Sequence, residues 1–289
     1  MAFNDRICFG ASKCGRIPGR EKQDTDILVT ALESGYTIFD TAESYAGGKS
    51  EKLLGDAIKY WAGDRDTLQL VSKISTAYTS SKHDVIKHCK ESLDRLQTDY
   101  LDVYLVHFFD EQLNLSVALD ALLELKQSGI IKEFGVSNFS PVDLKRLKDM
   151  ELANGISAKS KEGSTVLQTS YNIVNRKLDR YLLNLARSDY DLEIMSYSTL
   201  QRGELFKNQK IIELAREEGI TVAQLCIAWA LRHDGLIPIP RATTKEKMLE
   251  NLSALTITLS QETLAQIDNF FPVPPLTKEL LHDKHLVSN

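Results

Sequence analysis

The 289-residue sequence has no apolar run near the ~18 residues that a membrane-spanning helix needs. Its first residues carry Asp5 and Arg6 where a secretory signal peptide would carry its apolar segment. It also has no basic excess: 35 Lys and Arg residues against 40 Asp and Glu residues give a net charge of −5, the opposite of the basic surface typical of nucleic-acid binders. These absences predict a cytoplasmic protein whose partners include neither a membrane nor a nucleic acid.

Cysteine is scarce as well, and its spacing excludes the usual metal motifs. Only four cysteines are present; they are scattered, with no C-x-x-C pair and no histidine at zinc-finger spacing. His282 and His285 lie near the C-terminus, but two histidines near the end of a chain are more typical of a solvated tail than of a metal site. We therefore expect four reduced, mostly buried thiols and no metal site. The four cysteines are Cys8, Cys14, Cys89 and Cys226.

Short β-rich runs alternate with longer amphipathic segments along the chain. In residues 50–61, for example, apolar side chains recur at i, i+1, i+4, i+5 and i+8 and so share one helical face. The predicted strands are 7–10, 37–40, 68–73, 101–107, 132–137, 166–171, 193–198 and 236–240. The predicted helices are 50–61, 84–96, 116–126, 141–150, 179–187, 209–218, 221–232 and 245–255.

This alternation is typical of βαβ units and a parallel sheet, which either closes into a barrel or stays open and doubly wound. The polar residues favour the barrel, because they follow many different strands, and a barrel places all strand ends on one rim. We predict an α/β protein with a single (β/α)₈ TIM-barrel domain over residues 1–289, with a short C-terminal tail from about 272. The polar residues at strand ends are Asp40, Lys73, His107, Ser137, Asn138, Gln168 and Ser198.

Two glycine-containing segments resemble nucleotide-binding motifs but lack essential residues. The run Gly47-Gly48-Lys49-Ser50 matches the end of a P-loop, yet Glu43 stands where the motif needs glycine. No G-x-G-x-x-G follows a strand. A nicotinamide cofactor would therefore be held by something other than a Rossmann motif.

Four segments closely resemble the aldo-keto reductase family. They are FDTAESY at 39–45, GG and SEKLLG at 47–48 and 50–55, VSK at 71–73 and LVH at 105–107, and the likeness extends from about residue 7 to about residue 270. The resemblance implies a (β/α)₈ barrel that reduces the carbonyl group of small aldehydes or ketones to an alcohol with NAD(P)H. It also implies a small-molecule carbonyl substrate as partner; the sequence leaves open a monomer or a small homo-oligomer.

The chemistry of these residues agrees with the resemblance. Carbonyl reduction needs a hydride on carbon and a proton on the developing alkoxide, and a phenol with a pKa near 10 becomes a better proton donor beside a cation. Tyr45 would be the donor, Lys73 the cation, Asp40 the group that orients Lys73, and His107 a hydrogen-bonding partner of the substrate oxygen, with its protonation state open. Each residue alone also has a structural interpretation, as a cap, a surface charge or a core side chain. Their joint occurrence on adjacent strand ends favours catalysis.

The resemblance also implies cofactor contacts. Ser137, Asn138 and Gln168 would hold the nicotinamide carboxamide, since amides offer both donors and acceptors. Tyr197 would stack on the nicotinamide ring, and Ser198, Leu200 and Gly203 would line the pyrophosphate. Asn138 lies just before Ser140 and Pro141, which also resemble a helix N-cap and its first residue.

The segment 239–251 resembles the family's adenine and 2′-phosphate site. If Thr244 caps a helix, Lys247 in the first turn opposes the helix dipole, and a bound anion would offset that. We assign Arg241 and Lys247 to the 2′-phosphate and Glu250 and Asn251 to the adenine; a solvated basic helix start is the alternative. Many relatives have arginine at position 247, and lysine cannot make a planar bidentate contact. The charges of Arg241 and Lys247 favour NADPH as the cofactor. NADH stays an alternative because lysine makes a weaker phosphate contact than arginine.

The substrate end departs from the family pattern. Ser12 stands where many members have a large aromatic residue, and Phe108 and Phe109 after His107 are expected to keep one side of the pocket apolar. The alternative function is that of a cofactor-binding docking or regulatory subunit with little turnover, as in potassium-channel β subunits of this fold. A barrel hydrolase built on Asp40 would explain neither Lys73 nor the cofactor-like segments.

Overall fold

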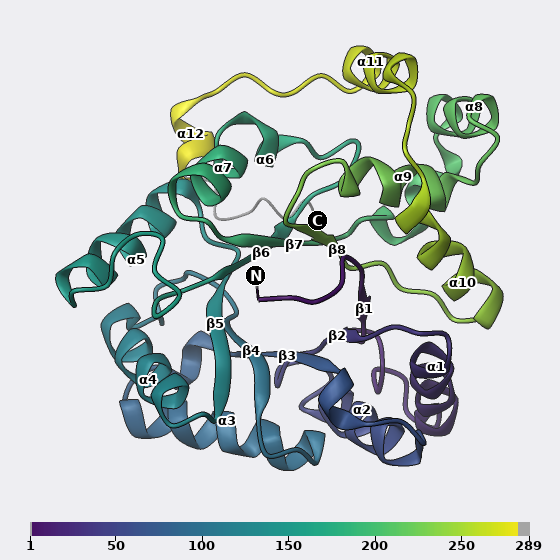
Figure 1. Cartoon of the computed structure of the whole chain (residues 1–289). Coiled ribbons are helices and arrows are strands. Elements are labelled where there is room, and N and C mark those ends of the chain that lie inside the picture. Colours follow the sequence, from purple (N-terminus) through teal and green to yellow (C-terminus); the bar gives the residue numbers. More distant parts are fainter. Residues whose placement is uncertain (1, 283–289) are drawn as a thin grey trace.

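Eight parallel strands pair in sequence order from β1 to β8, and helices surround them (Figure 1). The structure is a computed structural model that describes residues 2–282. The Gly10 amide donates to the Pro240 carbonyl at 3.3 Å, which brings the first strand beside the end of the last. The predicted (β/α)₈ barrel is confirmed. The strands are β1 (Cys8–Gly10), β2 (Ile38–Asp40), β3 (Gln69–Ile74), β4 (Leu101–Val106), β5 (Ile131–Ser137), β6 (Val166–Ser170), β7 (Glu193–Tyr197) and β8 (Leu236–Pro238).

The helices lie outside the barrel, and most match the predicted amphipathic segments (Figure 1). The longer ones are α1 (Glu21–Glu33), α2 (Lys49–Tyr60), α3 (Lys82–Leu96), α4 (Leu115–Gln127), α5 (Pro141–Ala153), α8 (Gln209–Glu217), α9 (Val222–Leu231), α10 (Lys245–Ser253) and α11 (Gln261–Phe270). The shorter ones are α6 (Lys177–Arg180), α7 (Leu182–Asn184), α12 (Lys278–Leu281), η1 (Arg65–Thr67), η2 (Thr76–Tyr78), η3 (Leu185–Asp189), η4 (Gln201–Lys207) and η5 (Ala254–Thr256).

Three helical regions differ from the prediction. Helix α1 was not predicted, because its first half, 21–26, is entirely polar and its buried apolar residues fall in less than two turns. It also missed α11, which buries only Thr263 and Ile267. The helix predicted at 179–187 is wrong as one element: Tyr181 has φ −151° and ψ −46°, which separates α6 from α7, and η3 continues as a π-helical turn.

The strands are buried on both faces, as a parallel sheet covered by helices requires. One apolar cluster lies between strands and helices, and a smaller one, which includes Val71, Val103 and Met195, is formed by the other faces of the strands. Gly135 on β5 is needed for close strand packing, because a Cβ atom there would lie 2.0 Å from the carbonyl oxygen of Val166. All four cysteines are buried and free, as predicted.

The N-terminal segment, the expected lack of metal and membrane sites and the C-terminal tail are the remaining points on which the sequence made predictions. Phe3 packs in the smaller cluster, so the N-terminal segment joins the core of the barrel, as its central position in Figure 1 also shows. Within residues 2–282, no three His, Cys, Asp or Glu side chains are grouped to hold a metal, and no helix is long and apolar enough to cross a bilayer. His285 and the last residues of the predicted tail, 283–289, lie outside the described residues.

Candidate active site

Lys73 is buried at the carboxyl end of β3 beside two oxygen acceptors. Its Nζ atom donates to Asp40 Oδ1 at 2.7 Å and to the Thr41 carbonyl at 2.6 Å. Strand register explains the meeting: Asp40 on β2 pairs with Val71 on β3, so Lys73 lies two residues further on and faces the same side. Burial disfavours the ammonium ion, but the carboxylate of Asp40 and the nearby phenol outweigh it, and the pKa of Lys73 is raised. This side chain is therefore a buried ammonium group that is charged at neutral pH.

Tyr45 lies over that ammonium group. It follows β2 in a turn whose Tyr45 amide donates to the Ala42 carbonyl at 3.0 Å, and Ala46 and Gly47 continue the turn with positive φ angles. The Lys73 Nζ atom is 4.9 Å from the centroid of the Tyr45 ring. Burial raises the pKa of Tyr45, and the charge of Lys73 opposes the rise without reversing it. The predicted downward shift is thus present as one contribution, but the net direction in this structure is upward, and the phenol is protonated at neutral pH.

His107 completes the group from the end of β4. Its Nδ1 atom lies 3.2 Å from the Ser44 hydroxyl, its ring stacks on Phe108 with centroids 4.4 Å apart, and the Tyr45 ring is 5.5 Å away. Burial, with a smaller contribution from the charge of Lys73, lowers the pKa of His107 to about 3. The protonation state that the sequence left open is therefore the neutral one.

The amide side chains predicted to hold a carboxamide are hydrogen-bonded in two separate groups. Gln168 Nε2 donates to Asp40 Oδ1 at 2.7 Å, and Asn138 Nδ2 donates to the His107 carbonyl at 2.9 Å. The Tyr197 hydroxyl donates to Asn138 Oδ1 at 2.6 Å. Ser140 also caps α5 through a capping box with Asp143, as the helix-entry interpretation expected. The hydrogen bonds of Asn138, Gln168 and Tyr197 thus fix three side chains that line one cleft.

The loop after β7 has a strained backbone. Ser198, Gln201 and Arg202 all have φ between 43° and 58°, a region that non-glycine residues rarely occupy. The Asn172 amide holds the loop by donating to the Ser198 carbonyl at 3.0 Å. Such strain is concentrated at ligand-binding segments in proteins. The sequence contained no signal for it, since none of the three is a glycine.

The first turn of α10 has the predicted capped start. The Thr244 hydroxyl accepts a hydrogen bond from the Lys247 amide at 3.4 Å. Arg241 lies before it, with one Nη atom 3.8 Å from Asp24 on α1. Arg241 Nε and Asn251 Nδ2 are buried and have no hydrogen-bond partner among the described residues. Buried donors without partners are costly and are commonly satisfied by a ligand.

One cleft of about 790 Å³ joins these parts at the carboxyl ends of the strands, within the size range of small-molecule sites. Of the predicted site residues, all except the fully buried Lys73 line it, so the structure brings the two groups of predictions together. Phe108 also lines the cleft, whereas Phe109 packs against Phe139 with centroids 5.1 Å apart and lies outside its lining, which corrects the prediction for that residue. Five further lining residues were not predicted, and the signal for them in the sequence was their place in loops that follow strands. They are Lys13, Arg16, Thr199, Arg202 and Phe206.

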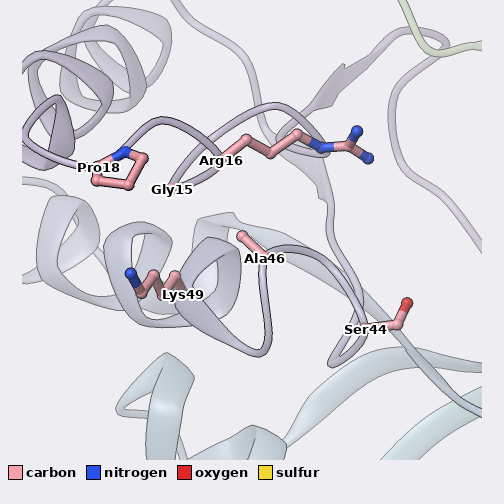
Figure 2. Close-up of a pocket in the computed structure, with 6 residues that line it drawn as sticks. All are labelled: Gly15, Arg16, Pro18, Ser44, Ala46 and Lys49. Atoms are coloured by element: carbon pink, nitrogen blue, oxygen red, sulfur yellow. The ribbon is translucent and has the colours of Figure 1, made fainter.

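A second cavity, of about 470 Å³, adjoins the cleft and shares Arg16 with it. Gly15, Pro18, Ser44, Ala46 and Lys49 complete its lining (Figure 2). In Figure 2 the Arg16 side chain extends toward the side where Ser44 lies, and the Lys49 side chain extends the opposite way. The second cavity is therefore lined by an arginine, a lysine and a serine next to the Tyr45 turn.

Comparisons with known proteins agree on one family. The model described as the Aldo/keto reductase family matches residues 6–271. Methylglyoxal reductase YeaE of Escherichia coli strain K12 is 31% identical over 265 residues, which cover 90% of this chain and 88% of that protein. The structure of an aldo/keto reductase from Klebsiella pneumoniae in complex with NADP and acetate superposes with a TM-score of 0.84 at 34% identity, covering 94% of this chain and 93% of the other. A second structure from Klebsiella pneumoniae, in complex with NADPH, gives a TM-score of 0.83 at 35% identity and covers 93% and 92%.

Proposed function

The chain belongs to the aldo/keto reductase family, and from this premise we propose that it reduces small aldehydes or ketones to alcohols with NADPH, using Tyr45 as proton donor. The observation that carries the proposal is the contact of the buried Lys73 ammonium group with both the Asp40 carboxylate and the Tyr45 ring. A purely structural ion pair would not account for a titratable phenol beside it in a cleft. Proton donation to an alkoxide does account for the phenol, because the reaction requires an acid at that place.

The proposed proton transfer follows from the charges around Tyr45. As the carbonyl oxygen gains negative charge, the phenol proton moves to it, and the phenolate that remains is stabilised by Lys73. Asp40 keeps Lys73 charged within a site where burial alone would favour the neutral amine. The net upward pKa shift of Tyr45 agrees with this role, because a proton donor has to be protonated before the reaction starts.

His107 is proposed to orient the substrate carbonyl. Since its imidazole is neutral, one ring nitrogen accepts and the other donates. If the Ser44 hydroxyl donates to Nδ1, the proton lies on Nε2, which then donates to the carbonyl oxygen. A neutral donor aligns the oxygen without competing with Tyr45 for the role of acid.

The cleft residues fit NADPH, which supplies the hydride when it is bound. Asn138 and Gln168 offer amide groups for the nicotinamide carboxamide, and Tyr197 offers a ring face beside them. The unpartnered Arg241 Nε and Asn251 Nδ2 atoms are donors that the phosphate and adenine would satisfy. Arg241 and Lys247, both in the cleft lining, are proposed to bind the 2′-phosphate, whose charge distinguishes NADPH from NADH.

The first experiment follows NADPH consumption by absorbance with methylglyoxal as substrate, since proteins named methylglyoxal reductases are among the relatives. We expect steady turnover by the natural chain and a loss of roughly 10² or more in kcat for Tyr45→Phe, in line with the contribution of a general acid. Tyr197→Phe, which also removes a hydroxyl from the cleft, is the matched control and should lose less. Equal rates for Tyr45→Phe and the natural chain would refute the proton-donor assignment. NADPH binding without turnover on any carbonyl would instead support the docking alternative.

A further inference from the structure

The walls of the cleft carry an excess of positive charge at its mouth. Five cationic side chains line the cleft, and the only acidic ones among its lining residues are Asp40, which is paired with Lys73, and Glu250. The pKa of Lys13 is lowered, first by burial and then by the positive charges of Arg16, Arg202 and Arg241. An excess of cations over carboxylates in a cleft indicates anionic ligands. The five cations are Lys13, Arg16, Arg202, Arg241 and Lys247.

Most of these cations lie where the proposed cofactor places its phosphates. Arg241 and Lys247 belong to the proposed 2′-phosphate site, and Arg202 lies in the strained β7 loop next to the proposed pyrophosphate residues. Lys13 is exposed and precedes Arg16 in the loop after β1. The phosphates of the cofactor thus account for three of the five cations.

Arg16 differs from the other four in its position. It acts on the pKa of Tyr45, lines the cleft, and also lines the second cavity with Ser44 (Figure 2). Ser44 in turn is bonded to His107. Arg16 therefore belongs to the end of the cleft where the carbonyl reacts, and the phosphates of the cofactor do not explain it.

The Arg16 side chain is held by one hydrogen bond, and its guanidinium group has no carboxylate partner among residues 2–282. Its Nε atom donates to the Ser12 carbonyl at 2.8 Å, which fixes the side chain against the β1 loop. It forms no ion pair with any of residues 2–282, although the side chain is exposed. The lining of the second cavity contains no acidic residue at all. A planar guanidinium group presented in this way matches a carboxylate or a phosphate with two parallel hydrogen bonds.

We propose that Arg16 and the second cavity form an anion subsite for the substrate, so that the preferred substrates are aldehydes or ketones that carry a carboxylate or phosphate group near the carbonyl. This inference rests on the proposed function, because it places the anion relative to Tyr45 and His107. It goes further by assigning a substrate class. Ser12, a small residue where many family members have a large aromatic one, lines the same cleft as Arg16.

The test compares two aldehydes of similar size that differ in charge: 4-carboxybenzaldehyde and its neutral methyl ester. The ester withdraws more electron density from the aldehyde than the carboxylate does, but this difference is the same for every variant and cancels when their ratios are compared. We expect the ratio of their kcat/KM values to favour the acid in the natural chain and to fall about 10-fold or more in Arg16→Gln, since a hydrogen bond to a charged group is lost. Arg16→Lys should keep part of the preference. Any effect of Arg16 on Tyr45 changes both substrates alike, so the ratio isolates the anion contact.

Arg20→Gln is the matched control, because Arg20 is an exposed arginine on the same loop that lines neither cavity. It should leave the ratio unchanged. Glyceraldehyde 3-phosphate against glyceraldehyde forms a second pair, and it decides whether phosphate or carboxylate is preferred. Equal ratios in the natural chain and Arg16→Gln for both pairs would overturn the subsite, while turnover of the neutral ester would still support the proposed function. Weaker NADPH binding by Arg16→Gln with unchanged ratios would assign Arg16 to the cofactor instead.

Discussion

Gln168 Nε2 lies 2.7 Å from Asp40 Oδ1, and this hydrogen bond joins β6 to β2 across the interior of the barrel. The same Asp40 oxygen accepts from Lys73 Nζ at 2.7 Å. One carboxylate atom therefore connects a residue proposed to contact the cofactor with the cation proposed to stabilise the phenolate. Positions 40 and 168 are far apart in the sequence, and only closure of the barrel brings them together.

The Asp40–Lys73 pair is predicted to matter for stability as well as for catalysis. Asp40→Leu leaves a buried ammonium group without its counter-charge, and breaking a buried pair in this way costs about 3–5 kcal/mol. We expect that loss in the free energy of unfolding measured with urea, together with a large fall in kcat. The double variant Asp40→Leu/Lys73→Met removes both charges and should recover much of the stability but none of the activity. If the double variant regained turnover, Lys73 would have no role in catalysis.

The neutral state of His107 predicts how stability depends on pH. The pKa of His107 is about 3 in the folded protein and ~6.5 when unfolded, so below pH 6.5 the unfolded chain binds the additional proton and folding is disfavoured. The linkage predicts that the contribution of this residue is about 2 kcal/mol less favourable at pH 5 than at pH 8. His107→Gln should flatten the profile of unfolding free energy between pH 5 and pH 8. His83→Gln, which replaces an exposed histidine, is the control; an identical slope in the natural chain and His107→Gln would contradict the assigned protonation state.

The 2′-phosphate assignment predicts a difference between two lysines in one helical turn. Lys247 lines the cleft, and Lys245 does not. Lys247→Ala should weaken NADPH binding about 10-fold, because it removes a charged contact with the phosphate, and should change NADH binding little. Lys245→Ala should affect both cofactors equally and weakly. Binding is measured by fluorescence titration at fixed ionic strength; equal losses for NADPH and NADH in Lys247→Ala would count against the phosphate site.

The activity of the natural chain is predicted to depend on the protonated form of Tyr45. Burial raises the pKa of this phenol above its ordinary value near 10, so a donor that must carry its proton stays competent throughout the neutral range. Reduction should therefore show a plateau in kcat from neutral pH upward and fall only as the pH passes the raised pKa. The measurement is a pH profile of kcat with methylglyoxal. A decline centred near pH 7 would indicate a different acid.

The barrel was predictable from sequence because its strands and helices follow local patterns, and the candidate site residues were predicted from the family resemblance of the segments that end those strands. Strands buried on both faces read as continuous apolar runs, and the rim of a barrel collects the polar residue that ends each strand, such as Lys73 or His107. Helix α1 was not predictable in this way, because less than two of its turns carry an apolar face. The break at Tyr181 in the helical region after β6 was not predicted either, because no proline or glycine marks it in the sequence.

The sequence determined which chemical groups meet at the rim, because strand order and the alternation of side chains fix them. The tertiary structure alone decided their protonation. The pKa of Tyr45 rises and that of His107 falls because burial removes water from both groups, and the extent of burial depends on segments distant in the chain. It also decided that Arg16, a loop residue without a motif, faces a cavity beside the reacting groups, since the path of a loop is set by the surfaces on which it packs.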